Sequence, residues 1–413
     1  MIFREMAGGG DEVDLDLRRR AANVIAGGAS TGSKRPGALY GPDDEDAPVH
    51  YLRASGCRIV TPGGRELVDC TMALGAVALG YADEVVAHAV AEAASNGNVA
   101  GLSPALEVEL AERLVDLVPC AERVRFLKTG AEGVAAAVRL ARAATGRDIV
   151  VGCGYFGWLD WASEGPGVPP RSHADVVRVP FDDVAALRSA AEAAGRALAA
   201  IVLEPVIERL PSEEWTRAAR ELCDRLGAVL VFDEVKTGFR LRPAGYQELS
   251  GVVPDVAVFA KALANGFPLS AVVGKAAVMD AARQAWVSST LASETTALAA
   301  ASAVLDRHAR TGVCASLAET GANMRHAVQL AIRSSGIAGV SVDGLDPMWL
   351  LRFDDERRQD RFLAIARREG VLFKRGAYDF ASLAHDEDTI AAIESAATTA
   401  FVELLEEEAH AEA

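Results

Sequence analysis

Two ionisable residues follow apolar runs that are typical of buried strands. Asp233 ends the run LVFD, and Lys261 follows the run VAVFA 28 residues further along the chain. A buried carboxylate needs a cationic or hydrogen-bonding partner, and a pyridinium nitrogen is one such partner. A lysine in such a place loses hydration, so its pKa falls and its neutral amine can form a Schiff base. The alternatives are an Asp233 that caps the next turn and a Lys261 at the surface, but the apolar runs and the spacing favour the chemical interpretation.

Three further motifs also follow strand-like runs. Thr129–Ala131 comes after VRFL and opens a helix-like segment, so its N–H groups and the Thr129 hydroxyl could bind a phosphate. An ordinary N-cap by Thr129 is the alternative. Tyr155 and Phe156 follow IVVG, where an aromatic ring could stack on a planar group or simply pack in the core. Glu204 ends AAIVLE and could form a hydrogen bond within a site or satisfy nearby backbone.

The segments that carry these motifs alternate between helical and continuous apolar patterns. The strand-like runs are Val124–Leu127, Ile149–Gly152, Val176–Val179, Ala200–Leu203, Ala228–Phe232 and Val256–Ala260. The helix-like segments are Asp83–Ala94, Pro104–Leu117, Ala131–Thr145, Val184–Ala194 and Thr216–Leu226. Strands that are apolar on both faces and alternate with helices predict a mainly parallel sheet covered on both sides. Ligands of such sheets bind at the carboxyl ends of the strands, where the motifs fall.

The length of 413 residues predicts two lobes. We expect an α/β fold with a large domain over 81–310 and a small α/β domain formed by 1–80 and 311–413. Within the first segment, the sequence predicts disorder up to residue 15, then a helix to Ile25, a loop over Gly27–Asp46 and a hairpin of Cys57–Val60 with Glu66–Asp69.

The charge and the cysteines narrow the class of protein. The net charge is −16, from 42 basic and 58 acidic residues, which argues against nucleic acid or an anionic membrane as the main partner. The six cysteines are scattered without a CxxC pair, which is typical of reduced core residues in a cytoplasmic protein. The first residues contain no apolar segment of a signal peptide, and no apolar run reaches the length of a membrane span.

In this order, the motifs resemble those of class III aminotransferases that depend on pyridoxal 5'-phosphate (PLP), which have fold type I. The resemblance runs from about Gly27 to about Phe401. The glutamate-1-semialdehyde aminomutase branch is similar in RLARAATGR at Arg139–Arg147, in DEVKTGFR and in FASLAHDED at Phe380–Asp388. A looser likeness to aminotransferases of sugar and secondary-metabolite pathways lies in GWLDW, AKALANGFPLSAVVG, SET at Ser293 and the lysine Lys236.

The resemblance implies PLP as cofactor and assigns roles to the residues above. Lys261 corresponds to the Schiff-base lysine and proton shuttle, Asp233 to the pyridinium partner and Tyr155 to the ring that stacks on the cofactor. The other cofactor-binding positions are Thr129, Gly130 and Ala131 of the phosphate loop, Glu204, and Thr290, which corresponds to a threonine that reaches the phosphate of the neighbouring subunit. The resemblance therefore implies a homodimer with a shared active site.

Several residues depart from the aminomutase pattern. Ala131 lacks the usual hydroxyl, Phe156 replaces a histidine, and Leu74 replaces a tryptophan expected near the substrate. Lys34 stands where a carboxylate-binding arginine is expected, with Arg35 next to it. We expect substrate contacts at Lys34, Arg35, Leu74 and Phe156. The loop that gates the aminomutase site is shortened here to about Ala162–His173.

These departures favour a ping-pong aminotransferase over an aminomutase. We expect a small-molecule amino donor and a ketone or aldehyde acceptor, with a sugar-like or secondary-metabolite acceptor favoured. Intramolecular amino transfer, as in glutamate-1-semialdehyde aminomutase, is the first alternative. Other PLP outcomes such as epimerisation use the same residues, and a catalytically silent PLP-fold binding protein is the alternative from another class, against which the intact Lys261 and Asp233 argue.

Overall fold

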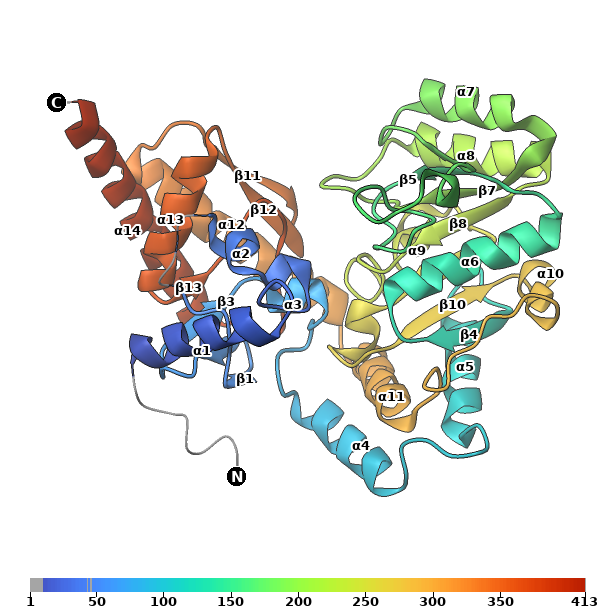
Figure 1. Cartoon of the computed structure of the whole chain (residues 1–413), viewed down its shortest axis with the longest axis horizontal. Helices are drawn as coiled ribbons and strands as arrows, with labels where there is room; N and C mark the ends of the chain where they lie inside the picture. The colour runs from blue at the N-terminus through green and yellow to red at the C-terminus, as the bar shows by residue number, and fades with distance from the viewer. Residues whose placement is uncertain (1–9, 43, 45–46, 413) are drawn as a thin grey trace. The chain divides into compact units, whose positions relative to one another are not determined.

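The computed structural model describes residues 10–42, 44 and 47–412. The chain divides into two compact units (Figure 1). The end unit is formed by Met1–Asp83 with Ala315–Ala413, and the central unit is Glu84–Cys314. Two separate stretches of sequence therefore build the end unit, whereas the central unit is continuous.

A seven-stranded sheet forms the centre of the central unit, in the order β4-β10-β9-β8-β7-β5-β6. The strands are β4 (Arg123–Leu127), β5 (Ile149–Cys153), β6 (Val176–Arg178), β7 (Leu198–Leu203), β8 (Val229–Asp233), β9 (Val256–Phe259) and β10 (Ser270–Gly274). β10 runs antiparallel to both of its neighbours, and the other pairs are parallel. The prediction of a mainly parallel sheet is confirmed. β10 was not predicted, because its run SAVVG follows a segment rich in Gly and Pro that is typical of a loop.

Helices cover this sheet on both faces. α6 (Gly130–Thr145) packs along β4 and β7 to β10, while α7 (Val184–Ala194) and α8 (Glu213–Leu226) pack on β7 (Figure 1). Every residue of β7 is buried, as expected for a strand covered on both faces. Under α6, the side chains of Val134 and Leu140 meet those of Val202, Val231 and Val258 in one apolar core. Burial of each such side chain contributes about 1.5–3 kcal/mol, so this core holds the start of α6 firmly against the sheet.

Three helices form a separate layer of the central unit: α4 (Glu84–Ser95), α5 (Ala105–Leu117) and α11 (Thr295–Arg310). α11 packs on both α4 and α5, and α5 packs on β4. The remaining short helices of the unit are α9 (Tyr246–Ser250) and α10 (Ala276–Met279). The segment between α4 and α5 and the segment before α11 therefore lie side by side.

The end unit combines two small sheets with helices. One sheet has the order β1-β2-β3-β13 (Arg53–Ser55, Arg58–Val60, Glu66–Asp69, Val371–Leu372), and the other has the order β11-β12-β14 (Val340–Leu345, Met348–Phe353, Asp379–Phe380). β2 and β3 form the expected hairpin, and β3 pairs in parallel with β13 from the other end of the chain. The helices are α1 (Asp11–Val24), α2 (Pro36–Tyr40), α3 (Met72–Gly75), α12 (Val313–Ser335), α13 (Glu356–Arg368) and α14 (Glu387–Glu412). The expected loop over Gly27–Asp46 thus contains a short helix, α2.

The start of α1 differs from the expectation of disorder up to residue 15. Residues 1–9 lie outside the described residues, and from Asp11 onward the chain is helical, so the prediction was wrong there. The buried Asp14 carboxylate accepts a hydrogen bond from Thr61 Oγ1 at 2.8 Å. Acidic side chains also favour the first turn of a helix. A contact with a distant part of the chain therefore stabilises this turn.

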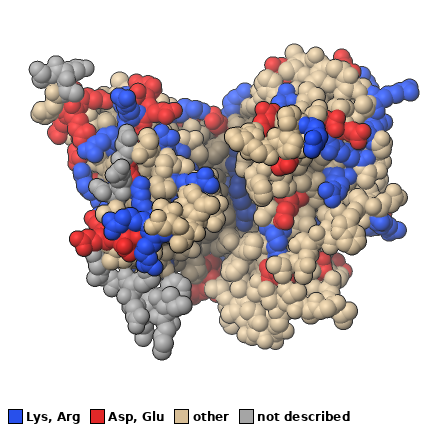
Figure 2. All heavy atoms as spheres, viewed as in Figure 1, with Lys and Arg blue, Asp and Glu red and all other residues tan. Residues whose placement is uncertain are grey.

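All six cysteines are buried and none forms a disulfide. Their burial raises the pKa of several thiols, including that of Cys153 to about 12. Within the described residues, no helix combines the length and the apolar composition needed to cross a membrane. Figure 2 shows basic and acidic side chains interspersed over much of the visible surface.

Candidate active site at the carboxyl edge of the central sheet

The pairing of β5, β7, β8 and β9 brings the predicted site residues together. Cys153 pairs with Leu203, Leu203 with Phe232, and Asp233 with Val258. The residues that follow these strands therefore emerge at one edge of the sheet, because the four strands are parallel. These strands are followed or ended by Tyr155, Glu204, Asp233 and Lys261.

Asp233 is 5% exposed at the end of β8. Its Oδ1 accepts a hydrogen bond from Val235 N at 3.1 Å. Burial and the nearby Glu204 carboxylate raise the pKa of Asp233 to about 7, although Lys261 and Lys236 act in the opposite direction. A buried carboxylate with so little compensation is suited to a further cationic donor. A protonated pyridine nitrogen supplies both a charge and a hydrogen bond, so Asp233 fits the PLP ring.

Lys261 begins the short 3-10 turn that follows β9. Its φ of 48° lies in the left-handed region, where a residue other than glycine is strained by roughly 1–3 kcal/mol. Burial lowers the pKa of the Lys261 amine, and the neighbouring Lys236 ammonium lowers it further, while Asp233 and Glu204 oppose this. These surroundings favour the neutral, nucleophilic amine that the sequence predicted.

Lys236 adds a charge that the sequence motifs did not place in the site. Its Nζ lies 2.6 Å from Glu204 Oε1, and both side chains are largely buried. Glu204 Oε2 in turn accepts the N–H of Tyr155 at 3.0 Å. Glu204 therefore neutralises Lys236 and fixes the backbone of Tyr155, which covers both roles that the sequence left open. Lys236 follows Asp233 by three residues, and this spacing within the turn was the available signal.

The phosphate-loop residues Thr129, Gly130 and Ala131 open α6. Thr129 is its N-cap, with Oγ1 accepting from Glu132 N at 3.2 Å, so the capping alternative is correct for its side chain. Glu132 Oε2 already accepts the N–H of Thr129 at 2.9 Å. Among the described residues, no acceptor is recorded for the N–H groups of Gly130 and Ala131. Two donors at the positive end of a helix are suited to a phosphate group.

Close packing places this loop beside the other motifs. A Cβ on Gly130 would lie 2.9 Å from the side chain of Val235, in the turn after Asp233. A Cβ on Gly157 would lie 2.3 Å from that of Ala131. The small side chain of Ala131 therefore allows the turn after β5 to approach the phosphate loop.

The adjacent aromatic residues Tyr155 and Phe156 have opposite environments. Tyr155 is 73% exposed, so its side chain is accessible to a planar ligand. Phe156 is 1% exposed and stacks on Trp161 with ring centroids 5.9 Å apart. The Arg178 guanidinium lies 4.8 Å from the centroid of the Phe156 ring. This burial indicates a packing role for Phe156 in place of the expected substrate contact.

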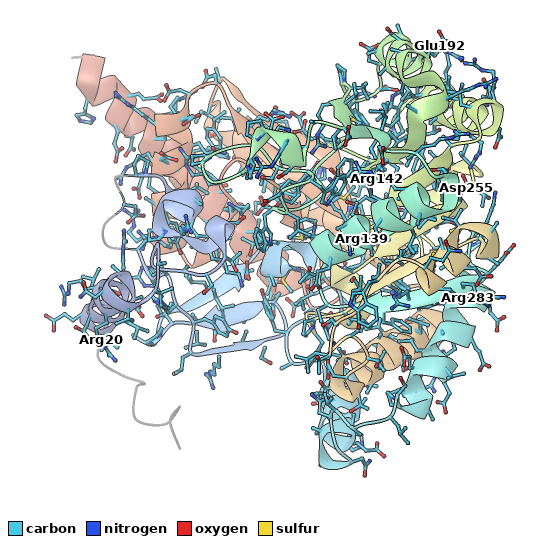
Figure 3. All side chains as sticks on the ribbon, turned by 45° about the vertical axis from the view of Figure 1, so that its right-hand side comes forward. Arg20, Arg139, Arg142, Glu192, Asp255 and Arg283 are labelled. Atoms are coloured by element: carbon cyan, nitrogen blue, oxygen red, sulfur yellow. The ribbon has the colours of Figure 1, made fainter. Side chains whose placement is uncertain are left out.

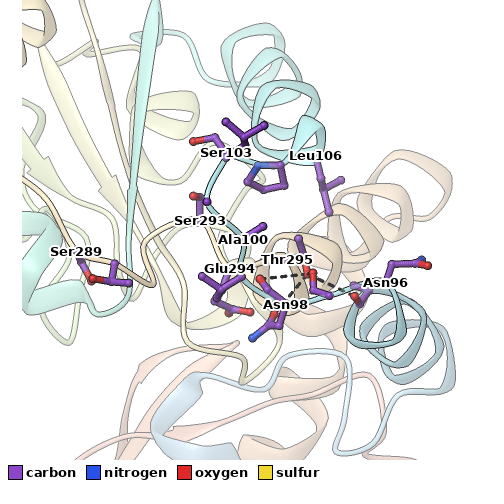
Figure 4. Close-up of a pocket in the computed structure, with 16 residues that line it drawn as sticks. Asn96, Asn98, Ala100, Ser103, Leu106, Ser289, Ser293, Glu294 and Thr295 are labelled. Atoms are coloured by element: carbon purple, nitrogen blue, oxygen red, sulfur yellow. Dashed lines mark hydrogen bonds between the residues drawn. The ribbon is translucent and has the colours of Figure 1, made fainter.

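Thr290 lies outside this group, in a cavity of about 640 Å³ (Figure 4). Residues 96–104, 289–290 and 293–295 line much of the cavity. Figure 4 shows Asn98 and Thr295 side by side, and Thr296 N donates to Asn98 Oδ1 at 3.0 Å. Thr290 itself is exposed.

The expected substrate residues Lys34, Arg35 and Leu74 belong to the end unit. Lys34 and Arg35 are exposed, and no ion pair of either is recorded among the described residues. Leu74 lies in a left-handed turn, with φ of 59°. Asp69 Oδ1 supports this turn by accepting Thr71 N at 2.7 Å, and Asp69 Oδ2 accepts Tyr81 Oη at 2.7 Å. Because these residues lie in the other unit, their contacts with a substrate stay predictions.

Comparisons with known proteins agree with this geometry. A family model described as aminotransferase class III matches residues 39–156 and 170–384. The 2'-deamino-2'-hydroxyneamine transaminase of Streptomyces kanamyceticus is 35% identical over 378 residues, covering 90% of this chain and 94% of the relative. A glutamate-1-semialdehyde 2,1-aminomutase of Desulforapulum autotrophicum is 30% identical, covering 92% of this chain and 96% of the relative. The solved FumI protein of a Sphingopyxis species, described as a PLP internal aldimine form, has a TM-score of 0.91 at 28% identity and covers 96% of this chain and 97% of that chain.

Proposed function

Because the chain belongs to the class III aminotransferases and uses PLP, we propose that it moves an amino group from a free amino donor to a separate carbonyl acceptor by a ping-pong mechanism. The observation that carries the proposal is the meeting of Asp233, Lys261 and the Lys236–Glu204 ion pair at one edge of the sheet. PLP, when bound, supplies a conjugated ring that accepts electrons from the carbon bearing the amino group.

The residues of the central unit have distinct tasks in this proposal. The Asp233 carboxylate binds the ring nitrogen and holds its proton. The neutral Nζ of Lys261 attaches the cofactor, and after its release it takes a proton from the carbon that bears the donor's amino group. The exposed ring of Tyr155 packs on the cofactor face, and the N–H groups of Gly130 and Ala131 bind its phosphate.

A bulky, hydroxylated acceptor is our proposal for the second half of the reaction. The transaminase of Streptomyces kanamyceticus, named for a neamine derivative, matches 90% of this chain. The short segment Ala162–His173 offers little material to close over the site, which suits exchange between separate molecules. Lys34 and Arg35 are proposed to bind the carboxylate of the donor, and Leu74 to contact the acceptor.

The similarity to aminomutases favours intramolecular amino transfer as a second candidate. A donor screen separates the two candidates. With glutamate, glutamine or alanine as a free donor, we expect the PLP form to be converted to the pyridoxamine form in a single turnover, followed by absorbance. The pyridoxamine form mixed with glutamate-1-semialdehyde is the comparison. Efficient formation of 5-aminolevulinate, with no reaction from a free donor, would favour the aminomutase.

We further propose that the protein is a homodimer in which Thr290 reaches the phosphate bound by the partner. Figure 2 shows few charged side chains over the part of the central unit where Figure 1 labels α4 and α11. The segment between α4 and α5, the helix α5 and the segment before α11 carry exposed apolar side chains. These are Val99, Leu102, Val108 and Leu291. Exposed apolar surface of this kind supports an interface between subunits in this part of the central unit.

Leu102→Glu should weaken the dimer by at least about 100-fold, because a charge would be buried against apolar surface. Leu102 is 85% exposed in the single chain, so the change should not unfold it. Sedimentation velocity over a range of concentrations measures the effect. Val177→Glu is the control, since this exposed residue of β6 lies at the opposite edge of the sheet from β4. Equal dimerisation of both variants would contradict the proposed interface.

We also propose a cytoplasmic location and small molecules as the only ligands besides the second subunit. The free, buried thiols support a reducing compartment. The net charge of −16 disfavours nucleic acid as a partner.

A further inference from the structure

The segment that carries Thr290 is short and tightly turned. Ala292 N donates to Ser289 O at 3.2 Å, and Glu294 N donates to Leu291 O at 3.2 Å. Thr290 lies within the first of these overlapping turns, and α11 begins directly after Glu294. Only three residues, held in these two turns, therefore separate Thr290 from Glu294. We call residues 286–294 the Thr290 loop.

The beginning of the Thr290 loop is attached to β4 and α6, which flank the phosphate loop, and its end is attached to Lys128, which lies between these two elements. At its beginning, Arg139 Nη1 donates to Trp286 O at 2.8 Å, and Arg125 Nη2 donates to Val287 O. Figure 3 labels Arg139 on α6. At its end, the Lys128 ammonium lies 2.8 Å from Glu294 Oε1. Lys128 directly precedes Thr129, so the last attachment begins next to the phosphate loop.

The Lys128–Glu294 ion pair is shielded from solvent, with side-chain exposures of 13% and 7%. Lys128 Nζ also donates to Pro268 O at 3.0 Å. Burial raises the pKa of Glu294, but hydrogen bonds from Lys128 and Thr296 outweigh it, and the pKa lies below its usual value. The carboxylate is therefore ionised at neutral pH. It also caps α11, because Oε2 accepts Thr296 N at 2.9 Å.

Because the Lys128 ammonium is committed to Glu294, the pair has two possible effects on a bound phosphate. Lys128 could attract the phosphate by its charge, in which case Glu294 would weaken cofactor binding. Alternatively, the pair acts through the loop that it holds. The attachments at both ends of the Thr290 loop favour the second effect, because they make the loop a rigid extension of β4 and α6.

We propose that Lys128 and Glu294 are positioning residues that fix the Thr290 loop against the phosphate loop, so that Thr290 meets the phosphate bound by a second copy of the chain. This proposal rests on the proposed dimer and its PLP site. It also connects the two sites of the dimer, since each Lys128 adjoins the phosphate loop of its own site and acts on the Thr290 that serves the other.

The test measures PLP affinity of the cofactor-free protein by fluorescence at concentrations where the dimer is complete. Glu294→Gln removes the charge but keeps an oxygen that can accept the N–H groups of α11. Glu294→Gln, Lys128→Met and Thr290→Ala should each weaken PLP binding by about tenfold. If the pair acts through Thr290, the double variant Thr290→Ala/Glu294→Gln should lose little more than either single variant.

Two controls separate positioning from a general structural role. Lys128→Arg keeps the ion pair and should retain most of the affinity. Lys275→Met breaks the ion pair with Asp255, which lies at the amino end of β9 (Figure 3), and should leave PLP affinity unchanged. The Lys275–Asp255 separation of 2.7 Å is similar to the 2.8 Å of the Lys128–Glu294 pair.

The outcomes that overturn the proposal are distinct from those that overturn the function. Tighter or unchanged PLP binding by both Glu294→Gln and Lys128→Met, or independent losses that multiply in the double variant, would overturn the positioning role in a dimeric holoenzyme. A wild-type chain that binds PLP as a monomer would instead overturn the proposed dimer. Failure of the wild-type chain to bind PLP at Lys261 would overturn the proposed site itself.

Discussion

Lys261→Ala should lower turnover by about 10³-fold or more, because the same amine attaches the cofactor and moves the proton of the substrate carbon. The site around it is built to keep this amine neutral, through burial and through the nearby Lys236 ammonium. Single-turnover kinetics with a saturating amino donor measure the loss. The variant should still bind PLP without a covalent bond, because the contacts of Asp233 and of the phosphate loop remain.

Borohydride reduction of the wild-type holoenzyme identifies the lysine directly. The reduced protein should carry the pyridoxyl group on the peptide that contains Lys261. For the turnover measurement, Lys275→Ala is the matched control of Lys261→Ala, since Lys275 lies in the same unit but pairs with Asp255. This control variant should keep near-normal turnover. A label on Lys128, Lys236 or Lys275 would show that Lys261 was wrongly assigned.

Asp233→Asn should leave PLP bound but reduce turnover by about 10³-fold. An amide cannot hold the ring nitrogen in its protonated form, so the ring accepts electrons less readily. Steady-state kinetics with an excess of PLP test this, and the visible spectrum checks that the cofactor is present. Asp255→Asn changes a carboxylate at the opposite end of the neighbouring strand β9 and should affect stability more than turnover. Near-normal turnover of Asp233→Asn would remove Asp233 from the proposed mechanism.

In the cofactor-free protein, Asp233→Asn should instead increase the stability of the fold. In the fold, burial and Glu204 raise the pKa of Asp233 from 3.8 to about 7. Below about pH 4 Asp233 is protonated in both the folded and the unfolded chain, so its burial carries no ionisation penalty. The free energy of unfolding then falls as the pH rises from about 4 through 7. Cofactor-free Asp233→Asn should unfold at a higher temperature than the wild type at pH 8, with a smaller difference at pH 4. Calorimetry at the two pH values measures this, and a lower midpoint at pH 8 would contradict the unfavourable burial of Asp233.

The parallel strands of the central sheet could be predicted because they are buried on both faces. Such strands appear as short continuous apolar runs, as in β7 and β8, and their periodicity needs no tertiary information. β10 was not predicted, although it is buried as well, because its short run follows Gly266 and Pro268, which are typical of turns. The first turn of α1 was not predicted, because Asp14 in it is stabilised by a hydrogen bond from Thr61, which is distant in sequence.

The sequence by itself determined where an ionisable residue ends a buried strand, and hence Asp233 and Lys261, because burial makes such residues conspicuous in an apolar run. Only the tertiary structure decided which charged residues form ion pairs. Lys236, which follows β8, pairs with Glu204, which follows the neighbouring strand β7. Lys128 pairs with Glu294, which is 166 residues away in the sequence. The tertiary structure also decided that Tyr155 faces outward while Phe156 packs inward. The physical reason is that the residue type alone sets the charge and size of a side chain, whereas its partners depend on how distant segments pack.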